Sequence, residues 1–96
     1  MKIFDPHDYP ELRDIFPELT PVQFEHSLLY AFGLSQKEIS TVRDVSYKVV
    51  KASISEAKSQ FESKSLTGLL TVIHVRLVLF ALYRCQRHRG ITVGQE

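Results

Sequence analysis

The segment from Leu66 to about Arg84 constrains the fold most strongly, because it predicts a helix with apolar side chains on two sides. At about 100° per residue, one apolar sector contains Leu66, Leu69, Leu70, Ile73, Leu77, Phe80 and Ala81. The other sector contains Val72, Val75, Leu79, Leu82 and Tyr83. A helix that packs on one globular body needs only one apolar side. We therefore expect the second sector to pack against the same helix of another copy, in a homodimer.

This segment is also near the shortest length that spans a membrane. His74 and Arg76 fall near its middle, where a charged side chain is costly in a bilayer. We therefore expect no membrane contact.

The composition indicates one small domain that is mostly or wholly α-helical. The chain has 96 residues, of which 44% are hydrophobic, and only 4 glycines and 4 prolines. Its single cysteine, Cys85, excludes an internal disulfide. Because the first residues also lack an apolar leader segment, we expect a cytoplasmic location.

Local signals predict three helices before the long one. The segments Thr20–Gln23 and Ser35–Glu38 are both capping boxes, which begin helices. Gly33 suits the left-handed residue that ends the first of these helices. After a turn at residues 43–45, Ser46 caps a third helix over about 46–61.

The third predicted helix has two distinct faces. Its buried stripe consists of Val50, Ile54, Ala57 and Phe61. A second sector contains Lys48, Lys51, Ser55, Lys58 and Ser59, with Ala52 beside them and no acidic residue. Small side chains between lysines give a thin, positive surface that suits contact with phosphates and base edges. An ordinary solvated helix face has the same composition, so both interpretations stay open at this point.

Several short motifs in the segment 19–61 resemble the LuxR/FixJ/NarL family of bacterial DNA-binding domains. They are Leu19-Thr20-Pro21, Gly33-Leu34-Ser35, Lys37-Glu38-Ile39, Val45-Ser46 and Val49-Val50-Lys51. The resemblance implies a four-helix domain with a helix-turn-helix, whose third helix enters the major groove. It implies that Lys48, Lys51 and Ser55 lie at the base edges in the major groove and that Lys37 and Arg43 contact DNA phosphates. It also implies dimerisation through the fourth helix.

The chain departs from the family pattern at six positions. Val22 and Gln23 replace an Arg-Glu pair, Arg43 replaces a core leucine, Ser53 a histidine, Glu62 a glycine and Leu66 an arginine. These departures favour a second hypothesis, in which the protein is an adaptor or anti-activator. Such a protein would bind a larger regulator through its long helix without contacting DNA itself.

The two ends of the chain carry weaker signals. We expect residues 1–18 to be an extension that packs on the domain formed by residues 19–96, with Asp8 capping a short helix. The apolar residues of this short helix, Leu12, Ile15 and Phe16, fall on one side of it. The long helix is expected over 66–88, and its end is basic, with Arg84, Arg87, His88 and Arg89. This basic end suits either a phosphate patch or a solvated helix terminus.

No catalytic or metal-binding pattern stands out. The four histidines are scattered, and Cys85 with His88 offers only two ligands where zinc usually has three or four. We expect no enzyme activity, no cofactor and no metal. The sequence therefore predicts a regulator of transcription that binds double-stranded DNA as a homodimer, with the adaptor as the alternative.

Overall fold

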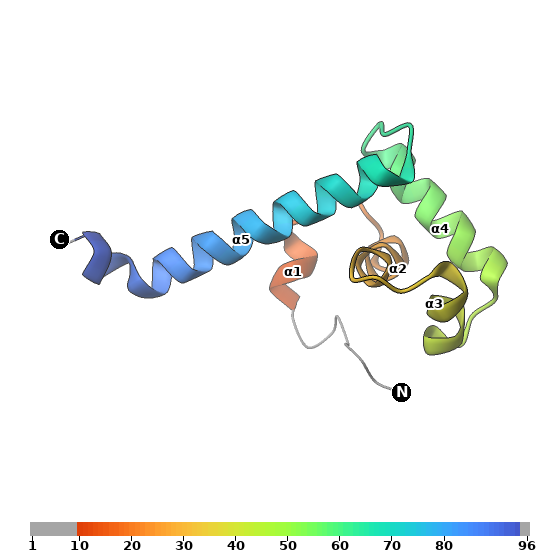
Figure 1. The fold of residues 1–96 in the computed structure, drawn as a ribbon, viewed down its shortest axis with the longest axis horizontal. Coiled ribbons are helices and arrows are strands. Elements are labelled where there is room, and N and C mark those ends of the chain that lie inside the picture. The colour runs from red at the N-terminus through yellow and green to blue at the C-terminus, as the bar shows by residue number, and fades with distance from the viewer. Residues whose placement is uncertain (1–9, 95–96) are drawn as a thin grey trace.

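The computed structural model describes residues 10–94 and the side chains of residues 10–86. Every regular element in this part of the chain is a helix, which confirms the all-α prediction. Helices α2 to α4 form a compact body, and α5 crosses it and then projects well beyond it (Figure 1). The helices are α1 (Pro10–Asp14), α2 (Pro21–Ala31), α3 (Gln36–Arg43), α4 (Tyr47–Gln60) and α5 (Leu66–Gly94). The predicted cap at Asp8 and the side chains of Arg87, His88 and Arg89 lie outside this description.

Both predicted capping boxes are present. The Thr20 hydroxyl accepts from the Gln23 amide at 3.2 Å, and the Gln23 side chain accepts from the Thr20 amide at 3.1 Å. Ser35 and Glu38 exchange the equivalent bonds at the start of α3. Gly33 has φ of +106°, in the left-handed region that glycine adopts most easily. These local signals therefore fix where α2 ends and α3 begins.

The connection between α3 and α4 is short. Asp44 ends α3 in the left-handed conformation, with φ of 56°, which aspartate tolerates better than most residues. The Ser46 hydroxyl then accepts a hydrogen bond from the Val49 amide at 3.1 Å and caps α4, as predicted. The chain thus reverses from α3 into α4 over three residues.

The core lies where α2, α3, α4 and α5 meet. Its buried apolar side chains are Phe16, Leu19, Phe24, Leu28, Leu29, Ile39, Val50, Ile54, Ala57, Leu69 and Ile73. The stripe predicted for the third helix therefore faces this core, with Phe61 packed at its edge. Because Leu69 and Ile73 belong to the first half of α5, that half is anchored in the body.

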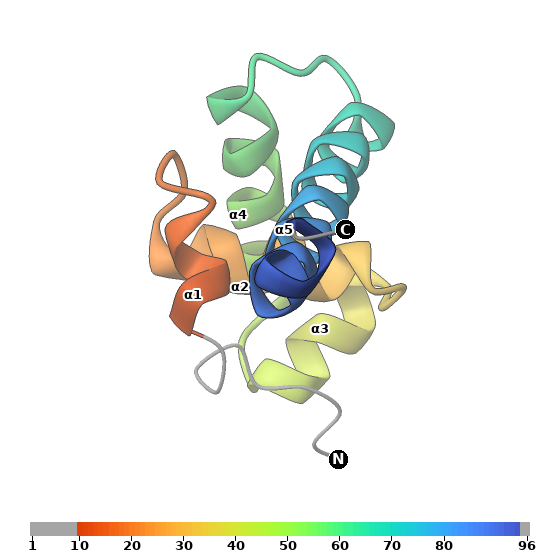
Figure 2. The ribbon, with the colours of Figure 1, turned by 90° about the vertical axis from the view of Figure 1, so that its left-hand side faces the viewer.

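Helix α5 is longer than the sequence indicated. It was expected over 66–88 but continues to Gly94. Gly90 lowers helix stability by about 1 kcal/mol relative to alanine, but no proline follows to stop the helix. The second half of α5 thus extends away from α2–α4, with α1 beside it (Figure 2).

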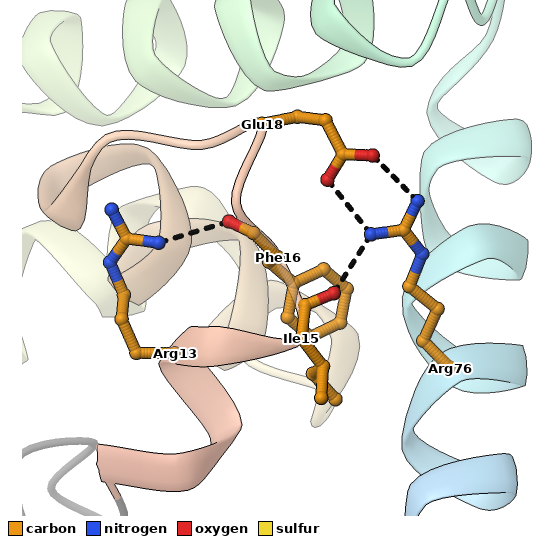
Figure 3. A network of polar contacts seen from close by, with 5 residues as sticks. All are labelled: Arg13, Ile15, Phe16, Glu18 and Arg76. Carbon is orange, nitrogen blue, oxygen red and sulfur yellow. Dashed lines mark hydrogen bonds and ion pairs between the residues drawn. The ribbon is translucent and has the colours of Figure 1, made fainter.

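Arg76 of α5 joins the N-terminal segment to the body (Figure 3). Its guanidinium donates two hydrogen bonds to the Glu18 carboxylate and one to the Ile15 carbonyl, each 2.8 Å long. It also lies 5.5 Å from the ring centroid of Phe16 and 5.0 Å from that of Phe61. Phe16 itself is buried, and Leu12 and Ile15 pack partly against the core. One side chain therefore holds three separate segments of the chain together.

Candidate functional site

The outer face of α4 carries the lysines that the sequence placed on one sector. Lys48, Lys51 and Ser55 are exposed, as are Ala52 and Ser59 next to them, and Lys58 is partly exposed. The opposite face of α4 is anchored, since Val50, Ile54 and Ala57 have no accessible surface. We call the exposed set (Lys48, Lys51, Ala52, Ser55, Lys58 and Ser59) the lysine face. It is held in a fixed orientation by the core behind it.

No carboxylate neutralises the lysine face. Glu56 is the one acid in α4, and its carboxylate accepts a hydrogen bond from the side-chain amide of Gln23 in α2 at 3.2 Å. Within the described residues, the ion pairs all involve arginines, and none involves Lys48, Lys51 or Lys58. The face therefore carries only positive and neutral side chains.

An open groove of about 700 Å³ adjoins this face. Its lining comes from the end of α2, the start of α3 and the first turns of α4, and consists of Tyr30, Ser35, Gln36, Lys37, Tyr47 and Lys51. The structure thus brings Lys37 and Lys51 to the same groove, although they are far apart in the sequence. The N-terminus of α3 adds partial positive charge, although the Glu38 carboxylate caps the same turn. Two ammonium groups, phenol hydroxyls and a helix N-terminus together suit a phosphate group.

Arg43 lies away from this groove. Its guanidinium forms a 2.5 Å ion pair with Glu25 of α2, and both side chains are mostly buried, at 25% and 15% exposure. The pair accounts for an arginine that is mostly buried at this position. Arg43 therefore links the end of α3 to α2 and shares its charge with a carboxylate.

Two polar contacts join α2 to α4, and no sequence motif predicts them. One is the bond from Gln23 to Glu56, and the other joins the buried ring of His26 to the buried hydroxyl of Ser53, with Nδ1 2.5 Å from Oγ. The Ser53 hydroxyl also donates to the Val50 carbonyl at 3.0 Å, so its single proton is used. His26 Nδ1 therefore carries the hydrogen in their contact. These bonds fix α4, and with it the lysine face, against α2.

The environment of His26 disfavours its charged form. Burial lowers the pKa of His26 below its usual value; the charge of Glu25 opposes this change and that of Arg43 reinforces it. His26 is thus a neutral residue of the α2–α4 contact at neutral pH.

The other sector of α5 is largely exposed. Of the residues expected at a dimer interface, Val75, Leu79, Leu82 and Tyr83 are 50–62% exposed, and Val72 is partly buried. Val78, which the sequence analysis did not select, is 56% exposed beside them. His74 does not take part, because its Nε2 contacts the Ala31 carbonyl at the end of α2 at 2.9 Å. The described part of α5 thus presents a continuous apolar surface to solvent.

No group of three His, Cys, Asp or Glu side chains that could hold a metal occurs among the described residues. The segment Leu66–Gln86 is long and apolar enough to cross a membrane, although core helices of water-soluble proteins meet the same criterion.

Comparison with protein-family models, with curated proteins and with solved structures finds no match for this chain.

Proposed function

We propose that this protein is a DNA-binding regulator of transcription that acts as a homodimer and inserts α4 into the major groove. The observation that carries the proposal is the lysine face, which is exposed, free of carboxylates and backed by a fully buried stripe. An α-helix fits the major groove, where Lys48, Lys51 and Ser55 would reach base edges. In this proposal α3, the short turn and α4 form the helix-turn-helix.

The groove beside α4 supports the assignment of phosphate contacts. Lys37, in the first turn of α3, and Lys51 of α4 both line this groove. A bound DNA phosphate would accept hydrogen bonds from both ammonium groups. Lys58 lies about two turns further along α4 than Lys51 and would contact the backbone as well, whereas Arg43 already shares its charge with Glu25.

One backbone feature also agrees with the family resemblance. Glu62, which stands where the family pattern has glycine, has φ of 54°. Such a left-handed conformation suits glycine best. The chain therefore keeps the turn after α4 that the family pattern would require, despite the different side chain.

The proposal is tested by binding to random-sequence duplex DNA over a salt series. Each phosphate contact lowers the slope of log K against log salt by about 0.9. With contacts from Lys37, Lys51 and Lys58 in each subunit, affinity should fall steeply as salt rises. Absence of binding at low salt would contradict the proposal.

A second function, the adaptor, is favoured by the exposed sector of α5. Val75, Leu79 and Leu82 offer an apolar surface that suits a helix of another protein. In this alternative the lysine face is only solvated. A protein that binds no DNA but forms a stable complex through α5 would fit it.

A membrane-spanning role for α5 is less compatible with the packing. Insertion of Leu66–Gln86 would remove Leu69 and Ile73 from the core and separate Arg76 from Glu18. A guanidinium left unpaired in a bilayer is costly. The packing therefore supports a role for α5 outside the bilayer.

A further inference from the structure

Exposed residues of α5, together with the partly buried Val72, form one stripe along the helix. We define the outer stripe as Val72, Val75, Leu79, Leu82 and Gln86, which follow one another at intervals of three or four residues. Leu79 and Leu82 are 59% and 62% exposed, although both are large apolar side chains. This spacing is the one that brings two helices together along a narrow seam.

The opposite side of the projecting helix is occupied by α1. Glu11 of α1 accepts a hydrogen bond from Arg84 at 2.8 Å, and Arg84 lies 5.7 Å from the ring centroid of Phe80. On a helical wheel these α5 residues lie roughly opposite Leu82. Because α1 covers one side of this part of α5, the outer stripe is the apolar side that stays accessible.

We infer that the outer stripe binds the outer stripe of a second copy, with the two α5 helices antiparallel and Leu79 at the two-fold axis. This inference rests on the homodimer of the proposed function and specifies its geometry. The stripe is symmetric about Leu79, because Val72 and Gln86 are each seven residues away. In the antiparallel pair, Leu79 meets its own copy, Val75 packs near the partner's Leu82, and Val72 packs near the partner's Gln86.

Charge decides between the antiparallel and the parallel arrangement. Helix α5 contains no acidic residue, and its arginines beyond Arg76 are at positions 84, 87 and 89. A parallel pair would bring these two basic ends within about 10 Å, the usual distance between packed helices. In the antiparallel pair, position 87 lies about 12 Å from the axis, so the basic ends are about 24 Å apart. That separation exceeds the screening length of ~10 Å at 0.1 M salt.

The same arrangement gives a spacing of the two bodies that suits DNA. Leu69 and Ile73 attach α5 to the body about 12 Å from Leu79 along the helix, so the two attachment points are about 24 Å apart. Helix α4 lies at the N-terminal end of α5, further from the axis (Figure 1). The two lysine faces would therefore be separated by a distance of the order of one DNA turn, ~34 Å. A parallel pair would hold the attachment points about 10 Å apart.

Disulfide trapping in the full chain tests this geometry. In a Cys85→Ser background, Leu79→Cys, Val72→Cys and Gln86→Cys are oxidised separately, and the last two are also oxidised as a mixture. The antiparallel pair predicts that Leu79→Cys converts to a linked dimer by itself. It also predicts that Val72→Cys and Gln86→Cys form linked dimers only when mixed, because a disulfide needs Cα atoms within about 7 Å. Helix content by circular dichroism controls for folding.

Two results would overturn the inference. Self-linking of Val72→Cys and of Gln86→Cys as readily as of Leu79→Cys would show a parallel pair. A chain that stays monomeric by light scattering and forms no linked dimer would exclude the interface. DNA binding by the unsubstituted chain is measured in parallel, so that failure of this geometry is distinguished from failure of the proposed function.

Discussion

The guanidinium of Arg76 donates two hydrogen bonds to the carboxylate of Glu18, each 2.8 Å long, although the two residues are 58 positions apart in the sequence. The same group lies over the rings of both Phe16 and Phe61. This contact ties the N-terminal segment to α5 and to the end of α4. It therefore determines how the long helix leaves the body.

Arg76→Ala is expected to lower the free energy of unfolding by about 1–2 kcal/mol. The loss comes mainly from the two aromatic contacts and the Ile15 carbonyl, since the partly exposed ion pair itself contributes little. Arg84→Ala is the matched control on the same helix, because its pair with Glu11 is more exposed. Urea unfolding measures both variants, and equal losses would contradict this role of Arg76.

Stability should fall as the pH drops below about 6.5, because burial lowers the pKa of His26 from its usual value of 6.5. Below that value the unfolded chain binds a proton that folded His26 resists, so the unfolded state is favoured. His26→Gln should remove this part of the pH dependence. The free energy of unfolding between pH 7.5 and about 5.5 tests this, and identical pH profiles would exclude His26 as the cause.

Two buried serines should respond in opposite ways to alanine. The Ser27 hydroxyl is buried with no hydrogen-bond partner, so Ser27→Ala should leave stability unchanged or raise it by up to about 1 kcal/mol. Ser53→Ala removes the partner of His26 and should lower stability by about 1–2 kcal/mol. Thermal unfolding of the two variants distinguishes them. A large loss in Ser27→Ala would show that its hydroxyl is satisfied.

Glu62→Gly should stabilise the protein by about 0.5–1 kcal/mol. The positive φ of 54° at Glu62 is strained for a residue with a Cβ atom, and the gain is reduced by the greater freedom of glycine in the unfolded chain. The exposed neighbour Lys64→Gly, whose φ is not positive, is the control and should not stabilise. A destabilised Glu62→Gly variant would show that the carboxylate has a role in this turn.

Leu79→Glu is expected to give monomers, because it places a charge at the centre of the outer stripe. Ala81→Glu adds the same charge to an exposed position on another side of α5 and should leave the dimer intact. Light scattering at several concentrations measures both. A dimeric Leu79→Glu variant would place the interface elsewhere.

The sequence predicted those features that depend on neighbouring residues. The capping boxes at Thr20 and Ser35, the left-handed Gly33 and the buried stripe of α4 follow from local hydrogen bonding and helical periodicity. The outward placement of Lys51 and its neighbours could be predicted for the same reason.

The contacts between distant segments could not be predicted in this way. Gln23 stands where the family pattern has a charged residue, and its side-chain amide donates a hydrogen bond to Glu56, which the sequence did not indicate. The pair of Arg43 with Glu25 and the bonds of Arg76 to Glu18 are further cases, and the phosphate contact of Arg43 stays a prediction. Each depends on which helices lie side by side, and helical periodicity does not specify that. Helix α5 also continues beyond the predicted end at residue 88, through Gly90, although glycine commonly ends helices.

The salt dependence of DNA binding by Lys51→Ala, compared with that of the unsubstituted chain, tests the central claim most directly. Lys64→Ala is the control, because Lys64 is exposed in the link between α4 and α5 and lies outside the lysine face. If Lys51 contacts a phosphate, Lys51→Ala should weaken binding and make the slope of log K against log salt less negative by about 0.9 for each subunit. Lys64→Ala should change neither quantity. Equal affinity and slope in Lys51→Ala and the unsubstituted chain, with folding and dimerisation intact, would contradict DNA recognition by the lysine face.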